Sequence, residues 1–150
     1  MEAQEIAELR TMYIFTPAEG ATWGLTYSLL EEKLRARDPD EFIRFDGDPD
    51  GPAHGSVMYF GITLDGEELE GIARLSPEGV AIQDCTAHLA VEFVRWLRTE
   101  VVPDGATITY NTEWGLESDL PDDIVPDVPR PRLVGVFVTH IEATGGLDLD

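Results

Sequence analysis

The chain has 150 residues, and its 30 Asp and Glu against 10 Lys and Arg give a formal net charge of -20. This length favours one domain, and 43% hydrophobic residues are too many for a disordered chain. The charge excludes nucleic acid and anionic membranes as direct partners, because neither finds a basic stripe to bind. The single cysteine, Cys85, excludes an intramolecular disulfide framework.

The first predicted elements are a strand over residues 12–16 and a helix after Pro17. The strand segment is rich in aromatic and branched side chains, and proline suits the first turn of a helix. Four apolar residues then follow at helical spacing: Trp23, Tyr27, Leu30 and Leu34. Asp38 and Pro39 end the predicted helix, because the residue before a proline disfavours helical backbone.

The middle of the chain is predicted to be an antiparallel meander. Its strands are expected in four runs of aromatic and branched residues: residues 42–45, 56–64, 70–75 and 80–82. Asp65 and Gly66 together are a hairpin signal, and residues 76–79 indicate a second turn. We therefore expect most of the sheet to be built here.

A second helix is predicted to follow the meander, with Asp84 or Thr86 as its cap. Its buried stripe is expected to consist of Ala87, Ala90, Val94, Leu97 and Val101. A strand over residues 106–111 comes next. Residues 112–130 then form a long acidic connection, with a short helix expected near 114–116, and a compact domain rarely needs such a connection unless it is functional.

The pattern of residues 131–143 is ambiguous between helix and strand. Pro131 and the pair Gly145 and Gly146 frame a helix, whereas the valines of this segment prefer a strand. We favour the helix and leave the strand open. The N-terminus and the tail over residues 145–150 are expected to fray.

Together these elements predict a single α+β domain over residues 1–150. A mainly antiparallel sheet of about five to six strands should be packed by two or three helices. The expected order is roughly β-α-β-β-β-β-α-β, followed by a helix or a strand.

The main functional hypothesis is a non-enzymatic interaction protein that binds a basic protein through acidic loops. A negative surface accelerates the encounter with such a partner, and a tryptophan ringed by carboxylates is typical of a binding hot spot. The expected contact residues are Asp46, Asp48, Asp50, Glu113, Trp114, Glu117, Asp119, Asp122 and Asp123. In general character the chain is similar to the small acidic immunity proteins that neutralise basic nuclease toxins, although no shared motif carries this likeness.

A small-molecule-binding protein or an enzyme, with a pocket between helix and sheet, is the alternative. Its candidate residues are Trp23, Tyr27, Cys85 and His88. At a helix start the dipole would lower the pKa of the Cys85 thiol, and His88 could serve as a base. Neighbours on one helix point outward side by side, however, so we expect no catalytic residues.

Neither a metal nor another cofactor is expected. The segment from Asp46 to Gly51 has half of the carboxylate spacing of a calcium loop, but Val57 stands where the bidentate glutamate belongs. A third interpretation is that the acidity reflects solubility or adaptation to salt. The acidic N-terminus and the lack of a long apolar run favour a cytoplasmic protein, and a homo-oligomer is compatible with the sequence.

Overall fold

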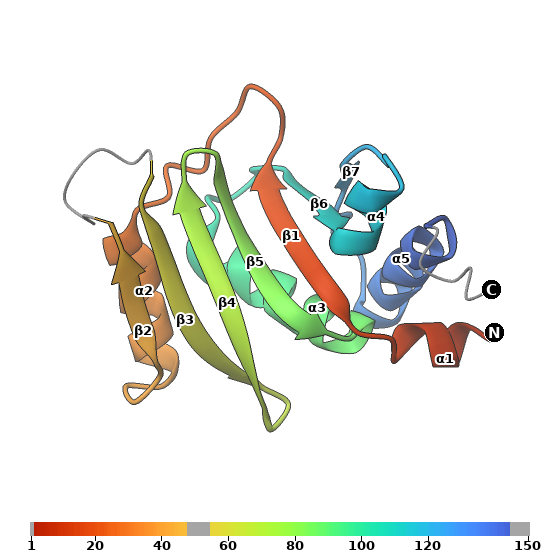
Figure 1. Cartoon of the computed structure of the whole chain (residues 1–150), viewed down its shortest axis with the longest axis horizontal. Coiled ribbons are helices and arrows are strands. Elements are labelled where there is room, and N and C mark those ends of the chain that lie inside the picture. The colour runs from red at the N-terminus through yellow and green to blue at the C-terminus, as the bar shows by residue number, and fades with distance from the viewer. Residues whose placement is uncertain (1, 48–54, 145–150) are drawn as a thin grey trace.

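The structure, a computed structural model, describes residues 2–47 and 55–144. Over these residues the chain forms a single antiparallel sheet with helices packed against one face. The opposite face is uncovered over the four central strands (Figure 1). The predicted α+β class is confirmed, with seven strands in the described residues instead of the five to six expected.

The strands follow the order β2-β3-β4-β5-β1-β6-β7 across the sheet. Their bounds are Thr11–Pro17 (β1), Ile43–Asp46 (β2), Val57–Leu64 (β3), Glu67–Leu75 (β4), Glu78–Cys85 (β5), Ile108–Thr112 (β6) and Asp123–Ile124 (β7). The predicted meander is confirmed as β2 to β5, and β1 pairs with both β5 and β6. Strand β7, which has only two residues, was not predicted, because a pair of residues gives no alternating pattern to read.

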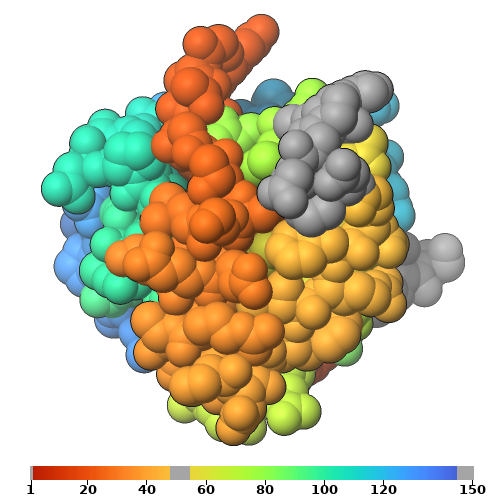
Figure 2. Space-filling model, turned by 90° about the vertical axis from the view of Figure 1, so that its left-hand side faces the viewer, coloured from red at the N-terminus to blue at the C-terminus, as the bar shows by residue number. Residues whose placement is uncertain are grey.

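Helices α2, α3 and α5 form the layer that covers one face of the sheet. The helix bounds are Ala3–Ala7 (α1), Tyr27–Arg37 (α2), Ala87–Trp96 (α3), Glu113–Glu117 (α4) and Arg130–Glu142 (α5), and the π-helical turn η1 over Leu97–Val101 extends α3. Figure 2 shows α2 in orange along one side of the molecule, with the β1–α2 connection projecting above it. None of the helices in the described residues is long and apolar enough to cross a membrane.

Local sequence signals place the hairpin and the second helix as expected. Asp65 and Gly66 both have positive φ, 51° and 79°, which is the backbone of a type I′ turn between β3 and β4. Thr86 caps α3 by accepting a hydrogen bond of 3.2 Å from the Leu89 amide. Thr86 is therefore the cap, and Asp84 is not.

Trp23 does not belong to the first long helix, contrary to its spacing. Helix α2 begins at Tyr27, and Thr26 is its cap. The backbone N–H groups of Trp23 and Leu25 donate instead to the Glu78 carboxylate on β5, at 3.1 and 2.7 Å. This contact joins residues far apart in the chain, so the local sequence pattern does not predict it. It holds the residues before Tyr27 in a loop.

The ambiguous segment over residues 131–143 is the helix α5. Leu133, Phe137 and Ile141, four residues apart, are all buried, so packing against the sheet outweighs the strand preference of the valines. The N-terminus, expected to fray, forms the short helix α1, whose Ile6 is buried and which contacts α5. Residues 145–150 lie outside the described part of the chain.

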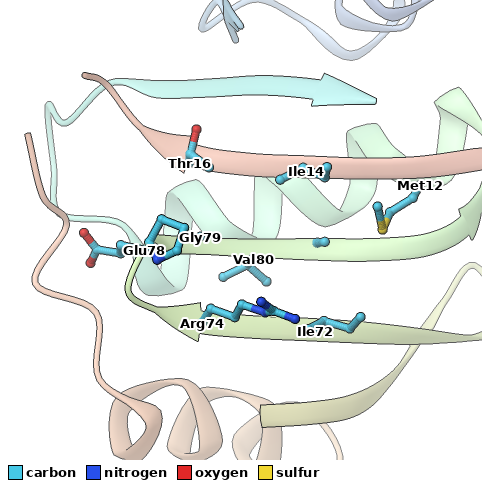
Figure 3. A pocket seen from close by; sticks show the side chains of 10 residues that line it. Met12, Ile14, Thr16, Ile72, Arg74, Glu78, Gly79 and Val80 are labelled. Atoms are coloured by element: carbon cyan, nitrogen blue, oxygen red, sulfur yellow. The ribbon is translucent and has the colours of Figure 1, made fainter. Parts of the chain in front are cut away.

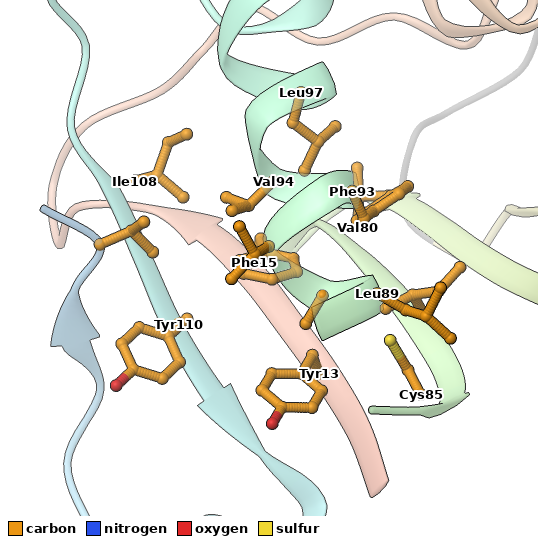
Figure 4. Packing of buried hydrophobic residues seen from close by; sticks show 14 of the residues in the cluster. Tyr13, Phe15, Val80, Cys85, Leu89, Phe93, Val94, Leu97, Ile108 and Tyr110 are labelled. Carbon is orange, nitrogen blue, oxygen red and sulfur yellow. The ribbon is translucent and has the colours of Figure 1, made fainter. Parts of the chain in front are cut away.

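The core fills the space between the covered face and the helix layer (Figure 4). One row of paired residues crosses six strands of this face: Phe45, Met58, Ala73, Val80, Phe15 and Tyr110. From α3, the Phe93 ring lies 5.9 Å from Phe15 and 6.3 Å from Phe60 between ring centroids. From α5, Phe137 lies 4.8 Å from Tyr110.

Candidate functional site

The uncovered side of the sheet, here called the open face, is apolar at its centre. Its central side chains are Met12, Ile14, Tyr59, Ile72 and Ala81, and all of them are half-buried. Tyr59 pairs with Ile72, Ile72 with Ala81 and Ala81 with Ile14, so they form a continuous row across β3, β4, β5 and β1. A contiguous apolar surface of this kind is typical of a binding face.

A shallow hollow of about 270 Å³ lies at the centre of the open face. Ile14 lies along one side of it, Ile72 along the other and Met12 at one end (Figure 3), and Ala81 also lines it. Arg74 also lines the hollow, and its side chain extends along β4 toward Ile72 (Figure 3). The hollow therefore presents apolar surface with one cationic side chain at its margin.

Charged residues of both signs flank this apolar centre. On β2, Arg44 stacks 4.6 Å from the Tyr59 ring centroid and lies 3.9 Å from the Asp46 carboxylate. On β4, Glu68 and Glu70 are exposed on the same side. Because alternate residues of a strand share a face, these carboxylates stand beside Ile72.

The two predicted acidic loops lie at opposite edges of the sheet. Asp46 ends the edge strand β2, whereas the connection over residues 113–127 surrounds the other edge strand, β7. Six strand spacings of about 4.8 Å separate these edges by about 29 Å. The structure therefore places the two loops apart, at the two margins of the sheet, and Asp48 and Asp50 lie outside the described residues.

The acidic connection is fastened to the sheet and to η1. Asn111 Nδ2 donates to the Leu120 carbonyl and to Asp122 Oδ1, both at 3.0 Å. Arg98 donates to the Val125 carbonyl at 2.8 Å. Because Asn111 pairs with Ile14, these bonds hold the connection beside the open face.

The carboxylates of the connection are exposed, but its tryptophan is not fully exposed to a partner. Five acids of the predicted contact are exposed in this segment: Glu113, Glu117, Asp119, Asp122 and Asp123. Trp114 is half-buried and packs against the core. The large apolar side chains exposed in this segment are Leu116 and Ile124, at 51% and 59%.

The four candidate pocket residues lie in different environments. Trp23 and Tyr27 are buried: the Trp23 indole donates to the Thr107 carbonyl at 3.1 Å, and the Tyr27 hydroxyl lies 2.9 Å from Ser56 Oγ. Both rings belong to the core. At helical spacing such aromatic residues are more often core than ligand cleft, and their burial here agrees with core packing.

Cys85 and His88 do not form a nucleophile and base. The Cys85 side chain is fully buried and its Sγ donates to the Thr86 carbonyl, whereas His88 is exposed. Burial raises the pKa of the Cys85 thiol to about 12. The expected lowering by the helix dipole is therefore wrong, because desolvation of the thiolate is the larger effect.

A groove of about 930 Å³ lies between helix α5 and the acidic connection. Hydrogen bonds from β6 and η1 fix the connection, and the groove runs between it and the exposed stripe of α5. Tyr110 and His140 form its floor, and the carboxylates of Asp122 and Asp123 line one wall. Among the described residues, no three His, Cys, Asp or Glu side chains are placed to hold a metal ion.

The apolar residues of the open face were not singled out from the sequence, and of the groove residues only Asp122 and Asp123 were, as part of the predicted acidic contact. A signal for the open face exists in β1, where Met12, Tyr13, Ile14 and Phe15 are all apolar, as in a strand covered on both sides. His140 carried no signal, since its neighbours in space come from distant parts of the chain. Comparison of the chain with known protein families, with curated proteins and with solved structures found no match.

Proposed function

We propose that the protein is a non-enzymatic interaction module, immunity- or inhibitor-like, that binds a basic protein through the open face of its sheet. The observation that carries this proposal is the row of half-buried apolar residues between acidic margins. Folding alone does not require apolar side chains on a face that no other element covers. A partner that excludes water from them supplies the missing driving force.

The size of the face suits one protein partner. A standard interface buries about 800 Å² on each side, which corresponds to a patch about 32 Å across. The distance of about 29 Å between the two edge strands, which takes in the uncovered central strands and the acidic margins, is similar. A partner seated on Ile14 and Ile72 would thus reach the acidic margins at both edges.

The charge of the chain indicates the chemistry of that partner. A net charge of -20 attracts a basic protein and repels a second copy of the chain. Glu68 and Glu70 beside the apolar centre, with Asp46 and the acidic connection at the margins, would form the polar rim. Arg44 and Arg74 would bind carboxylates or carbonyl groups of the partner at those two positions.

The test is capture from the native host followed by binding of the purified pair. Wild type is compared with Ile14→Thr/Ile72→Thr, which removes the apolar centre, and with Glu68→Lys/Glu70→Lys, which reverses the rim. Matched controls on the helix layer are Leu29→Gln and Glu32→Lys/Glu142→Lys. Sedimentation of the free protein shows whether a second copy occupies the face.

We expect a basic partner whose affinity falls tenfold or more with the apolar variant, as for a hot spot. The rim variant should mainly slow association and reduce its salt dependence. Both controls should bind like wild type. Unchanged binding by both open-face variants, an acidic partner, or a dimer that buries Ile14 without a partner would each overturn the proposal.

A further inference from the structure

We propose that the groove beside helix α5 binds an organic cation, an ammonium or guanidinium group on an apolar body. This groove is separate from the open face, so the proposal does not depend on the interface proposed above. Its residues come from β6, from the acidic connection and from α5. The tertiary structure alone brings them together.

The floor of the groove contains a buried hydroxyl without a partner. Tyr110 is 1% exposed, and its Oη makes no hydrogen bond within the described residues. In Figure 4 this hydroxyl points away from the apolar cluster around Phe15 and Val94. Burial raises the pKa of Tyr110, and the Asp123 carboxylate adds to this effect, so the hydroxyl stays protonated. A buried hydroxyl without a partner is costly, and a ligand or a water held by it can relieve that cost.

His140 lies beside Tyr110, with ring centroids 5.1 Å apart. Its Nε2 is 2.9 Å from Thr112 Oγ1, and no other hydrogen bond to the ring occurs within the described residues. Burial lowers the pKa of His140, although Asp123 opposes this. At neutral pH the floor is therefore uncharged and aromatic, which does not repel a cation.

Two carboxylates supply the attraction. Asp122 Oδ1 accepts from Asn111, and Asp123 Oδ1 accepts from the Ile124 amide. In each case the second oxygen, Oδ2, has no hydrogen bond in the part of the chain that the structure describes. Two such oxygens at one wall can receive the hydrogen atoms of an ammonium or guanidinium group.

The remaining wall selects for an apolar body. It is formed by Leu120, Pro121, Pro126, Val128 and Val136. One cation, Arg132, also lines the groove and forms no ion pair within the described residues. An anion could contact Arg132, but it would meet two carboxylates and a protein of net charge -20. The charge balance therefore favours a cation held away from Arg132.

The probes are phenethylamine, its uncharged analogue 2-phenylethanol and the anion phenylacetate. Binding is followed by NMR shifts of the Val128 and Val136 methyl groups and of the His140 ring, up to about 10 mM, which detects a millimolar Kd. A capped tripeptide with a central lysine forms a second arm. It distinguishes a free amine from a basic side chain of a peptide as the source of the cation.

Three variants test the roles of the residues. Asp122→Asn/Asp123→Asn removes the charges of the wall, and Glu117→Gln/Asp119→Asn removes two charges from the same segment outside the groove. Asn suits position 119 because its φ is +58°. Arg132→Gln removes the like charge.

We expect saturable groove shifts with phenethylamine or with the lysine peptide, and much weaker ones with the other two probes. The wall variant should weaken binding about tenfold, the matched control should leave it within about twofold, and Arg132→Gln should tighten it. Several results would overturn the proposal: no saturable shifts with either cation, equal binding of 2-phenylethanol, or binding of phenylacetate that Arg132→Gln abolishes.

Discussion

The two faces of the same sheet carry similar side chains in different circumstances. On β1, Tyr13 and Phe15 point into the core and are 1% and 0% exposed, whereas Met12 and Ile14 point to the open face and are half-buried. The helix layer packs against Tyr13 and Phe15, so folding alone explains why they are apolar. The helix layer does not explain the second pair, and for this reason we propose the open face as a binding surface.

The comparison of the two faces is tested most strongly by truncating two neighbouring residues of β1, Phe15 and Ile14. Phe15→Ala should lower the free energy of unfolding by about 3–5 kcal/mol, because it leaves a cavity between the sheet and α3. Ile14→Thr should lower it by less than about 1 kcal/mol, since the side chain is half-exposed and Thr keeps the strand preference. Urea denaturation measures both. Similar losses for the two variants would mean that the open face is covered in solution.

Glycines on the two faces provide a second comparison of smaller size. A Cβ added at Gly71 would lie 2.2 Å from the Phe60 ring on the covered face, whereas at Gly61 it would meet the end of the Glu41 side chain at 3.2 Å on the open face. Gly71→Ala should therefore destabilise by about 1–3 kcal/mol. Gly61→Ala should cost less than about 1 kcal/mol.

Thermal unfolding of the two glycine variants measures this difference in stability. The expected order is a clearly lower Tm for Gly71→Ala than for Gly61→Ala. The reverse order would contradict the assignment of the covered and open faces.

The smallest expected effect concerns histidines in the helix layer. Burial lowers the pKa of His140 in the folded protein, so below about pH 6.5 the unfolded chain takes up the proton first. Stability from this residue is therefore present at neutral pH and is lost as the pH falls toward 5. The effect should be absent in His140→Gln, and exposed His88→Gln serves as the control.

Urea denaturation at several pH values between 7 and 5 measures this contribution. The slope of stability against pH should be smaller for His140→Gln than for wild type and for His88→Gln. Carboxylates contribute equally to all three proteins in this range. Parallel curves for wild type and His140→Gln would show that His140 is protonated equally in both states.

The sequence alone determined much of the local structure. Alternation predicted β3, β4 and β5, the pair Asp65 and Gly66 predicted their hairpin, and a capped apolar stripe predicted α3. These elements follow from backbone preferences and from neighbours within a few residues, which a linear pattern contains. The net charge of -20 also suggested a basic partner, and this stays a prediction.

Only the tertiary structure decided which faces are covered and which residues meet. The bonds from Trp23 and Leu25 to Glu78 keep that segment out of α2, and packing of Phe137 on Tyr110 makes α5 a helix. The open face exists because all three long helices pack on the other side of the sheet. The groove lies between α5 and the acidic connection, which Asn111 and Arg98 fix in place through hydrogen bonds. Such contacts join residues far apart in the chain, so no local pattern could predict them.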